Sequence, residues 1–306
     1  MNYYICAMEK YNIAYSTKYG KCIEAKIEDV LNTNFLKKYH NKINLIFTSP
    51  PFPLNRKKKY GNLNGIEYIE WVTKITKLFH SLLTDDGSLV IELGNSWEPN
   101  MPVMSTLSLK TLLSIQENGP YYLCQNFIWY NNAKLPTPAQ WVNVDRIRVK
   151  DSFTHLWWLG KNPKPKANNR NILKEYSPSM NKLLTSKKYN SGLRPSEHNI
   201  GEKSFLTNNN GAIPSNVLIG GNTESSSNYI RYCKKKDIPL HPARMPKFIP
   251  EYFIKFLTQE GDLILDPFSG SNTTGEVSEK LKRKWIAIEA DHDYIEGSYG
   301  RFIKEN

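Results

Sequence analysis

Short apolar runs alternate with amphipathic stretches over most of the chain. Apolar, β-prone segments at 43–48, 88–93 and 262–266 predict buried strands. Between the first two segments, apolar residues recur at helical spacing and predict a helix over 66–83. Because strands and helices alternate in this way, the pattern predicts an α/β fold with a parallel sheet. Further strands are predicted over 123–130, 154–159 and 285–289, and further helices over 104–117, 249–258, 275–282 and 291–303.

The composition is that of a folded protein, with 40% hydrophobic and 23% charged residues among 306. No apolar run approaches the roughly 20 residues that a transmembrane helix needs, and the N-terminus lacks the order of a signal peptide. The four cysteines are far apart and the six histidines show no metal-ligand spacing. We therefore expect no disulfide framework and no metal, and a reducing cytoplasm is the expected compartment.

Positive charge is concentrated in the middle of the chain. Lys and Arg exceed Asp and Glu by 41 to 29, a formal charge of +12. Residues 151–240 alone hold 14 basic and 6 acidic residues, and the stretch 161–237 is rich in Asn, Ser, Gly, Pro and Lys with weak periodicity. A lysine-rich genome bias would spread the charge evenly, so the concentration favours an irregular region that contacts nucleic-acid phosphates.

One motif indicates a nucleoside-containing cofactor. The predicted strand ending at Asp266 runs into a turn of small residues, Gly-Ser-Asn-Thr-Thr-Gly at 270–275, and then into a helix. The next strand ends in Glu289, where a carboxylate can accept both hydroxyls of a ribose. The GxGxxG fingerprint of dinucleotide sites is absent, and Asp266 suits a cationic amino-acid group better than a pyrophosphate. This favours S-adenosylmethionine over NAD.

A second motif, Thr48-Ser49-Pro50-Pro51-Phe52, directly follows a predicted buried strand. Strand ends are where open α/β sheets place their ligands. The prolines hold the loop rigid and leave carbonyl acceptors, Ser49 adds a hydroxyl, and Phe52 offers a ring for stacking. Acceptors beside a stacking ring describe a pocket for a base that carries an exocyclic amine.

Together the two motifs resemble those of the DNA amino-methyltransferases that use S-adenosylmethionine. The catalytic motif comes first, the basic segment second and the cofactor motif last, an order similar to the β group of this family. The resemblance implies a Rossmann-like methyltransferase sheet with circularly permuted motif order. Residues 1–150 and 241–306 would form the catalytic and cofactor-binding domain, and 151–240 an irregular basic target-recognition region. Serine at Ser49 is typical of the cytosine-N4 enzymes of restriction-modification systems, whereas Asp or Asn is commoner in adenine-N6 enzymes.

The resemblance also implies roles for individual residues. Phe52 would stack on a cytosine flipped out of duplex DNA, while Ser49 and the Pro50 carbonyl accept hydrogen bonds from its N4 amine. Glu92 would hold Ser49 or take up the released proton, with an ordinary strand-end carboxylate as the alternative. Glu289 would bind the cofactor ribose, and Arg56, Lys57, Lys58, Lys59 and Tyr130 would contact DNA. The other cofactor-binding residues would be Asp266, Phe268, Gly270, Ser271, Asn272 and Thr273.

The chain departs from the family pattern at Lys26, where an acidic residue would contact the cofactor adenine, and Glu24 or Glu28 is a possible substitute. Adenine-N6 methylation by the same architecture is one alternative, and a DNA-binding protein with a decayed cofactor site is another. Carbon-5 cytosine methylation is disfavoured because the chain has no Pro-Cys dipeptide. The expected partner is double-stranded DNA, and no association with a membrane is expected. The chain is expected to act as a monomer, beside a cognate restriction endonuclease that it does not bind.

Overall fold

The computed structural model describes residues 11–52, 65–188, 191–201, 205–222 and 224–303. The chain divides into two units, one formed by residues 1–167 and 216–306 and the other by residues 168–215. Among the described residues, no helix is long and apolar enough to cross a membrane.

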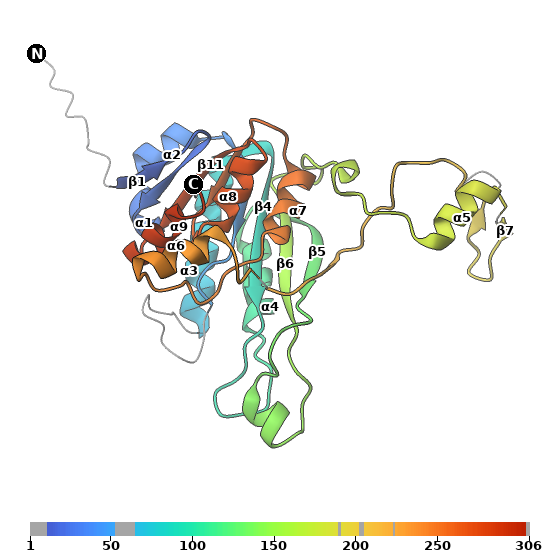
Figure 1. Cartoon of the computed structure of the whole chain (residues 1–306), viewed down its shortest axis with the longest axis horizontal. Helices are drawn as coiled ribbons and strands as arrows, with labels where there is room; N and C mark the ends of the chain where they lie inside the picture. The colour runs from blue at the N-terminus through green and yellow to red at the C-terminus, as the bar shows by residue number, and fades with distance from the viewer. Residues whose placement is uncertain (1–10, 53–64, 189–190, 202–204, 223, 304–306) are drawn as a thin grey trace, which may run out of the picture. The chain divides into compact units, whose positions relative to one another are not determined.

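The first unit is built on one nine-stranded sheet, with strand order β1-β2-β11-β10-β3-β4-β6-β5-β9 (Figure 1). Its five central strands are parallel, and the strand pairs β1–β2, β4–β6 and β5–β6 are antiparallel. The strands are β1 (Asn12–Ser16), β2 (Gly20–Glu24), β3 (Ile43–Thr48), β4 (Leu83–Gly94), β5 (Tyr122–Tyr130), β6 (Phe153–Gly160), β9 (Val217–Ile219), β10 (Leu263–Asp266) and β11 (Lys284–Glu289).

Helices cover both faces of this sheet, which explains why its central strands are apolar on both sides. One face packs against α1 (Ile27–Val30), α2 (Thr33–Tyr39), α3 (Gly65–Leu82) and α4 (Leu107–Asn118). The other face packs against α7 (Phe248–Leu257), α8 (Thr273–Lys280) and α9 (His292–Tyr299), drawn in orange and red in Figure 1. Helix α6 (Asn228–Lys236) lies against α9, and a π-helical turn, η1 (Gln140–Val144), follows β5.

The chain connections run in opposite directions along the sheet on the two sides of the β10–β3 pair. From β10 the chain passes through α8 to β11 on one side, and from β3 it passes through α3 to β4 on the other. Such a switch point opens a crevice at the carboxyl ends of the two strands, where α/β sheets bind ligands. Both motifs singled out in the sequence begin there, because one follows β3 and the other follows β10.

The predicted α/β class and permuted motif order are confirmed, and the predicted parallel sheet holds for the five central strands but not for β1 and β6 among the outer ones. Strand β6 enters the sheet antiparallel to β4 and β5. Strand periodicity carries no information about direction, which depends on the path of the connections. The terminal helix is also shorter than expected, ending at Tyr299 because a turn follows it.

The second unit, 168–215, is smaller than the region 151–240 expected from charge and composition. Residues 151–167 belong to the first unit because β6 is a strand of its sheet, and residues from 216 onward return to it through β9 and α6. The second unit holds η2 (Asn169–Ile172), α5 (Pro178–Ser186) and the short hairpin of β7 (Gly192–Leu193) and β8 (Asn199–Ile200). Composition marked the irregular region but could not exclude strands at its borders.

Candidate catalytic and cofactor site

Ser49 and Glu92 meet at the carboxyl ends of β3 and β4. The register pairs Thr48 with Ile91, so the next residue of each strand lies side by side. The Ser49 hydroxyl donates a hydrogen bond of 2.5 Å to Glu92 Oε2. Ser49 is half-buried and Glu92 is only 4% exposed. Because a serine hydroxyl has one proton, donating it to Glu92 leaves the oxygen lone pairs available to accept from a bound amine.

Burial dominates the electrostatics of Glu92. Loss of water raises the pKa of its carboxyl group, and the hydrogen bond from Ser49 and the positive charge of Lys134 partly oppose that rise. Lys134 is itself 3.5 Å from Asp151 Oδ2. A carboxyl group with a raised pKa takes up a proton more readily than an exposed glutamate does, which suits a proton acceptor.

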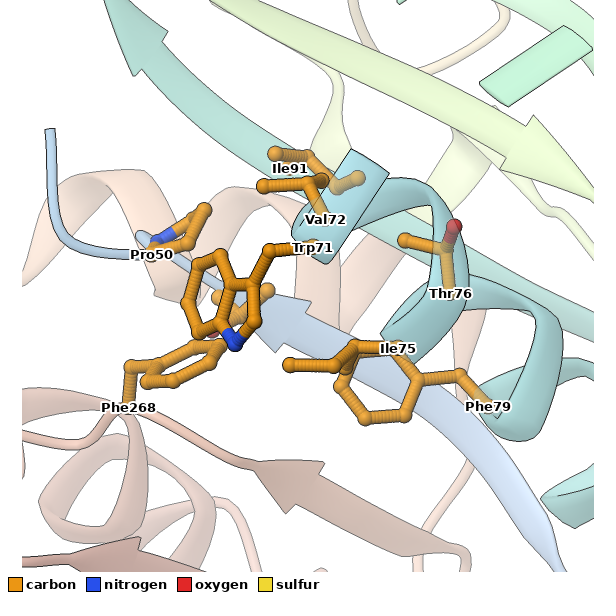
Figure 2. Close-up of a pocket in the computed structure, with 9 residues that line it drawn as sticks. Pro50, Trp71, Val72, Ile75, Thr76, Phe79, Ile91 and Phe268 are labelled. Carbon is orange, nitrogen blue, oxygen red and sulfur yellow. The ribbon is translucent and has the colours of Figure 1, made fainter. Parts of the chain in front are cut away.

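The first proline of the motif, Pro50, borders an apolar pocket. Pro50 lines this pocket together with Trp71 of α3 and Phe268 of the cofactor turn, and Figure 2 shows the three side chains facing one another. The Trp71 and Phe268 rings lie 5.5 Å apart between centroids. Pro51 and Phe52 are half-buried, and a Cβ on Gly94 would lie 3.7 Å from the Phe52 ring. The Phe52 ring therefore lies next to Gly94, two residues beyond Glu92 on β4.

Of the two possible substitutes for an acidic residue at Lys26, Glu28 is the one joined to the pocket. Its Oε1 accepts a 2.6 Å hydrogen bond from the Trp71 indole nitrogen. Glu24 instead pairs with His292 at 2.9 Å. The sequence left both carboxylates open, and the tertiary contacts distinguish them.

Asp266 ends β10 as a buried carboxyl group. Its Oδ2 accepts from the Thr274 hydroxyl at 2.6 Å and its Oδ1 from the Phe268 amide at 3.2 Å. Burial raises its pKa to about 6, and the hydrogen bonds oppose the rise. Glu289, at the end of the neighbouring strand β11, accepts the amide protons of Gly270, Ala290 and Asp291 at 2.7, 2.9 and 3.0 Å. Burial also raises the pKa of Glu289.

Ser271, Asn272 and Thr273 point into the protein, since each is at most 4% exposed. Asn272 caps α8, because its Oδ1 accepts from the Gly275 amide at 3.0 Å, and its Nδ2 donates to the Tyr15 hydroxyl at 2.9 Å. These three side chains therefore support the turn from the interior of the protein. Gly270 adopts φ +49°, and a Cβ there would lie 2.8 Å from His241 Nε2, so both backbone and space call for glycine.

The residues present fit S-adenosylmethionine. The turn leads into the N-terminus of α8 with carboxyl groups on both sides, at Asp266 and Glu289, which suit an ammonium group and a ribose. The buried Ser269 hydroxyl has no hydrogen-bond partner within the part of the chain that the structure describes, so a ligand atom can satisfy it. Among those same residues, no group of three or more His, Cys, Asp or Glu is placed to hold a metal ion.

The residues expected to contact DNA have different outcomes. Tyr130 is the last residue of β5 and is 38% exposed. Strand β5 runs in the same direction as β4, so it ends at the edge of the sheet that carries Ser49. Trp129, next to Tyr130 in the chain, is buried in the core, as is Trp157. Arg56, Lys57, Lys58 and Lys59 lie outside the described residues.

Sequence reasoning missed three residues that build the site: Trp71, Tyr15 and Arg301. Trp71 lies on an amphipathic helix, where an aromatic residue is expected in the core. Tyr15 lies 257 positions from Asn272, and Arg301 lies 30 positions from Ser271, which it contacts. Trp71 alone had a sequence signal, since it follows the Ser-Pro-Pro-Phe motif on the connecting helix.

Comparison with known proteins agrees with this geometry. A family model described as DNA methylase matches residues 43–300. The type II methyltransferase M.PvuII of Proteus hauseri is 42% identical over 266 residues, which cover 86% of this chain and 79% of that protein. The solved structure of the PvuII DNA methyltransferase, described as cytosine-N4-specific, aligns with a TM-score of 0.78 and 34% identity over 97% of this chain and 91% of that one.

A structure of M1.HpyAVI in complex with S-adenosylmethionine aligns with a TM-score of 0.52 and 19% identity, over 93% of this chain and 100% of that chain, a likeness in fold. The fold and the paired motifs define a methyltransferase of the class that acts on amino groups of DNA bases. The chain belongs to the DNA methylase family.

Proposed function

We propose that this chain is a site-specific DNA methyltransferase that transfers a methyl group from S-adenosylmethionine to the exocyclic N4 of a cytosine flipped out of duplex DNA. The observation that carries the proposal is the Ser49–Glu92 hydrogen bond beside the switch-point crevice, with the Asp266 turn on the neighbouring strand. Similarity to M.PvuII over most of both chains supports it.

In the proposed reaction, Phe52 stacks on the extruded base and Ser49 Oγ accepts a hydrogen bond from the N4 amine. The Pro50 carbonyl oxygen accepts a hydrogen bond from the second N–H of the amine. These two contacts draw the nitrogen lone pair out of conjugation with the ring, so that it becomes a nucleophile. Because unstacking a base costs a few kcal/mol, the stacking surface of Phe52 offsets part of that cost.

S-adenosylmethionine supplies an electrophilic methyl group on a sulfonium sulfur when it is bound. Asp266 and Glu289 would hold its ammonium and ribose, and Phe268 and Trp71 border the apolar pocket between the two motifs. The new nitrogen–carbon bond forms as the carbon–sulfur bond breaks, and the nitrogen then loses one proton. Ser49 passes that proton to Glu92 by accepting it at Oγ while its own proton moves along the 2.5 Å hydrogen bond. Positioning of the two reactants supplies most of the rate, roughly 7–11 kcal/mol in favourable cases.

The basic second unit, 168–215, would contribute to recognition of the DNA target. It contains seven Lys and Arg residues and three Asp and Glu residues. Action as a monomer beside a cognate restriction endonuclease stays a prediction from the family resemblance. The cytoplasm stays a prediction from the widely spaced cysteines.

The test is mass spectrometry of nucleosides after the protein has acted on unmethylated duplex DNA with S-adenosylmethionine. We expect N4-methylcytosine from the unmodified protein and none from Ser49→Ala. Ser81→Ala is the matched control, because that hydroxyl donates to the Leu78 carbonyl at the end of α3, before β4 begins, and should leave the product unchanged. N6-methyladenine would overturn the target base, and the absence of both products would overturn the proposal.

A further inference from the structure

Arg301 is a buried cation directly behind the cofactor turn. It follows α9, and only 6% of the residue is exposed. Its Nε donates to the Ser271 carbonyl oxygen, and its Nη2 donates to the Ser271 hydroxyl at 3.0 Å. Its guanidinium plane therefore holds one residue of the turn by both its backbone and its side chain, as the rigid fork of an arginine allows.

The turn needs such a restraint because its backbone is unusual. Ser271 lies between two residues with left-handed backbone angles, Gly270 at φ +49° and Asn272 at φ +54°. Asparagine tolerates this conformation better than most residues, but it remains less favourable than a right-handed one. Non-glycine residues hold such angles when surrounding contacts enforce them.

The charge of Arg301 is compensated within the same cluster. Its Nη1 lies 2.6 Å from Glu276 Oε2 and 3.8 Å from Glu224 Oε2, and Lys247 pairs with the other Glu276 oxygen at 2.6 Å. The guanidinium carbon lies 4.7 Å from the centre of the Tyr229 ring. The Tyr229 hydroxyl in turn accepts from the amide of His241, whose ring borders Gly270. The ion pairs and the Tyr229 ring together hold the guanidinium group in place.

We propose that Arg301 is a positioning residue for the cofactor: it holds the 270–272 turn in the conformation that binds S-adenosylmethionine. The proposal rests on the function proposed above for the same site. Arg301 is buried and acts on the turn through its contacts with Ser271. Nothing in the reaction itself requires it, so its loss should change cofactor affinity and the rigidity of the turn.

The matched experiment compares Arg301→Lys with Arg283→Lys. Arg283 is a second partly buried arginine that holds a loop with three donors, to Thr258 Oγ1, the Thr258 carbonyl and the Leu281 carbonyl. It precedes the amino end of β11, whereas the cofactor turn follows the carboxyl end of the neighbouring strand β10. Lysine keeps the charge in both variants and loses the fork. Calorimetric titration with S-adenosylmethionine should show about tenfold weaker binding for Arg301→Lys, the loss of one charged hydrogen bond, and unchanged binding for Arg283→Lys.

Hydrogen exchange of the cofactor-free protein gives a second readout. The Asn272 amide donates to the Ser269 carbonyl at 2.7 Å and reports whether the turn opens. It should exchange faster in Arg301→Lys than in Arg283→Lys. If Arg301→Lys does not fold, Ser271→Ala removes only the hydroxyl acceptor and should weaken binding about threefold, because the carbonyl contact remains.

The outcomes separate the two proposals. Unmodified protein that binds no S-adenosylmethionine would overturn the proposed function, and the exchange comparison would still decide whether Arg301 holds the turn. The positioning role alone would be overturned if the unmodified protein binds S-adenosylmethionine normally and Arg301→Lys matches Arg283→Lys in both affinity and Asn272 exchange. In the case where only Ser271→Ala folds, unchanged affinity in that variant would overturn it as well.

Discussion

The hydroxyl of Ser49 donates to a carboxylate oxygen of Glu92, and the parallel register of β3 and β4 enforces this contact. The two residues are 43 positions apart and belong to different sequence segments. Their pairing converts a common loop motif into a site with a hydrogen-bond acceptor and a buried proton acceptor.

Replacing Glu92 by Gln should lower the turnover number while leaving the fold intact or more stable. The amide can still accept from Ser49 but cannot take up a proton, so we expect about a hundredfold loss of kcat. Burial in the folded state raises the pKa of Glu92 above its value in the unfolded chain. Ionisation of Glu92 therefore lowers the free energy of unfolding. This loss of stability grows as the pH rises from the unfolded pKa through the folded pKa. Glu92→Gln removes that loss. Its gain in the free energy of unfolding should therefore be larger at pH 8 than at pH 4, and exposed Glu117→Gln should show no such trend.

The pH dependence of methyl transfer should reflect the same carboxyl group. In the proposed reaction the ionised form of Glu92 is the active one, and burial raises the pKa of this carboxyl group above its ordinary value. Activity at saturating cofactor should therefore fall on acidification at a higher pH than an ordinary glutamate would give. The measurement is kcat across pH 4.5–9 on a short duplex. An acidic limb that persists unchanged in the residual activity of Glu92→Gln would contradict the assignment.

Asp266 should make cofactor affinity depend on pH. Its pKa is raised to about 6 by burial, so protonation below that pH removes the negative charge that would pair with the cofactor ammonium in the proposed site. The dissociation constant for S-adenosylmethionine should therefore rise as pH falls through this range, and Asp266→Asn should bind weakly at every pH. Asp262→Asn, at the start of the same strand, should keep the pH dependence. A pH-independent affinity in the unmodified protein would count against an ionised Asp266 in the site.

Removing the Tyr15 hydroxyl should destabilise the protein through the cofactor turn. That oxygen accepts from Asn272 Nδ2 at 2.9 Å and lies 2.6 Å from the Ser298 hydroxyl. In Tyr15→Phe the buried Asn272 amide loses its partner, which costs about 1–3 kcal/mol of unfolding free energy. Urea denaturation measures this, with Tyr122→Phe as control because Tyr122 is 52% exposed. Equal stability of the two variants would show that the hydroxyl contributes nothing.

The lysines of the second unit should govern the salt dependence of DNA binding. Lys182, Lys187 and Lys188 are exposed there. If each contacts a phosphate, their replacement by Gln should reduce the slope of log K against log salt by about 2.7, at roughly 0.9 for each contact. The control replaces Lys37, Lys38 and Lys42, exposed lysines beside the start of β3, and should leave the slope unchanged. Equal slopes for the two triple variants would exclude the second unit as a phosphate-binding element.

The local elements around the site were within reach of the sequence. Strand β3 was predicted at its observed bounds, Ile43–Thr48, because a continuous apolar run ended by prolines has few other structures open to it. The helix after it and the strand–turn–helix at 263–280 followed from periodicity and small residues. The permuted methyltransferase sheet was implied by the resemblance of the two motifs, in this order, to those of the DNA amino-methyltransferases.

Only the tertiary structure decided which distant residues meet. The sequence identified Ser49 and Glu92 as candidates, but the β3–β4 register brought them to 2.5 Å. It predicted that Asn272 lines the ligand, whereas the folded chain turns that side chain toward Tyr15. It contained no sign of Arg301, because an arginine after a terminal helix resembles any solvated cation until packing buries it behind Ser271. Local pattern reports the conformation of neighbours in the chain, and burial and long-range pairing arise only when the whole sheet has formed.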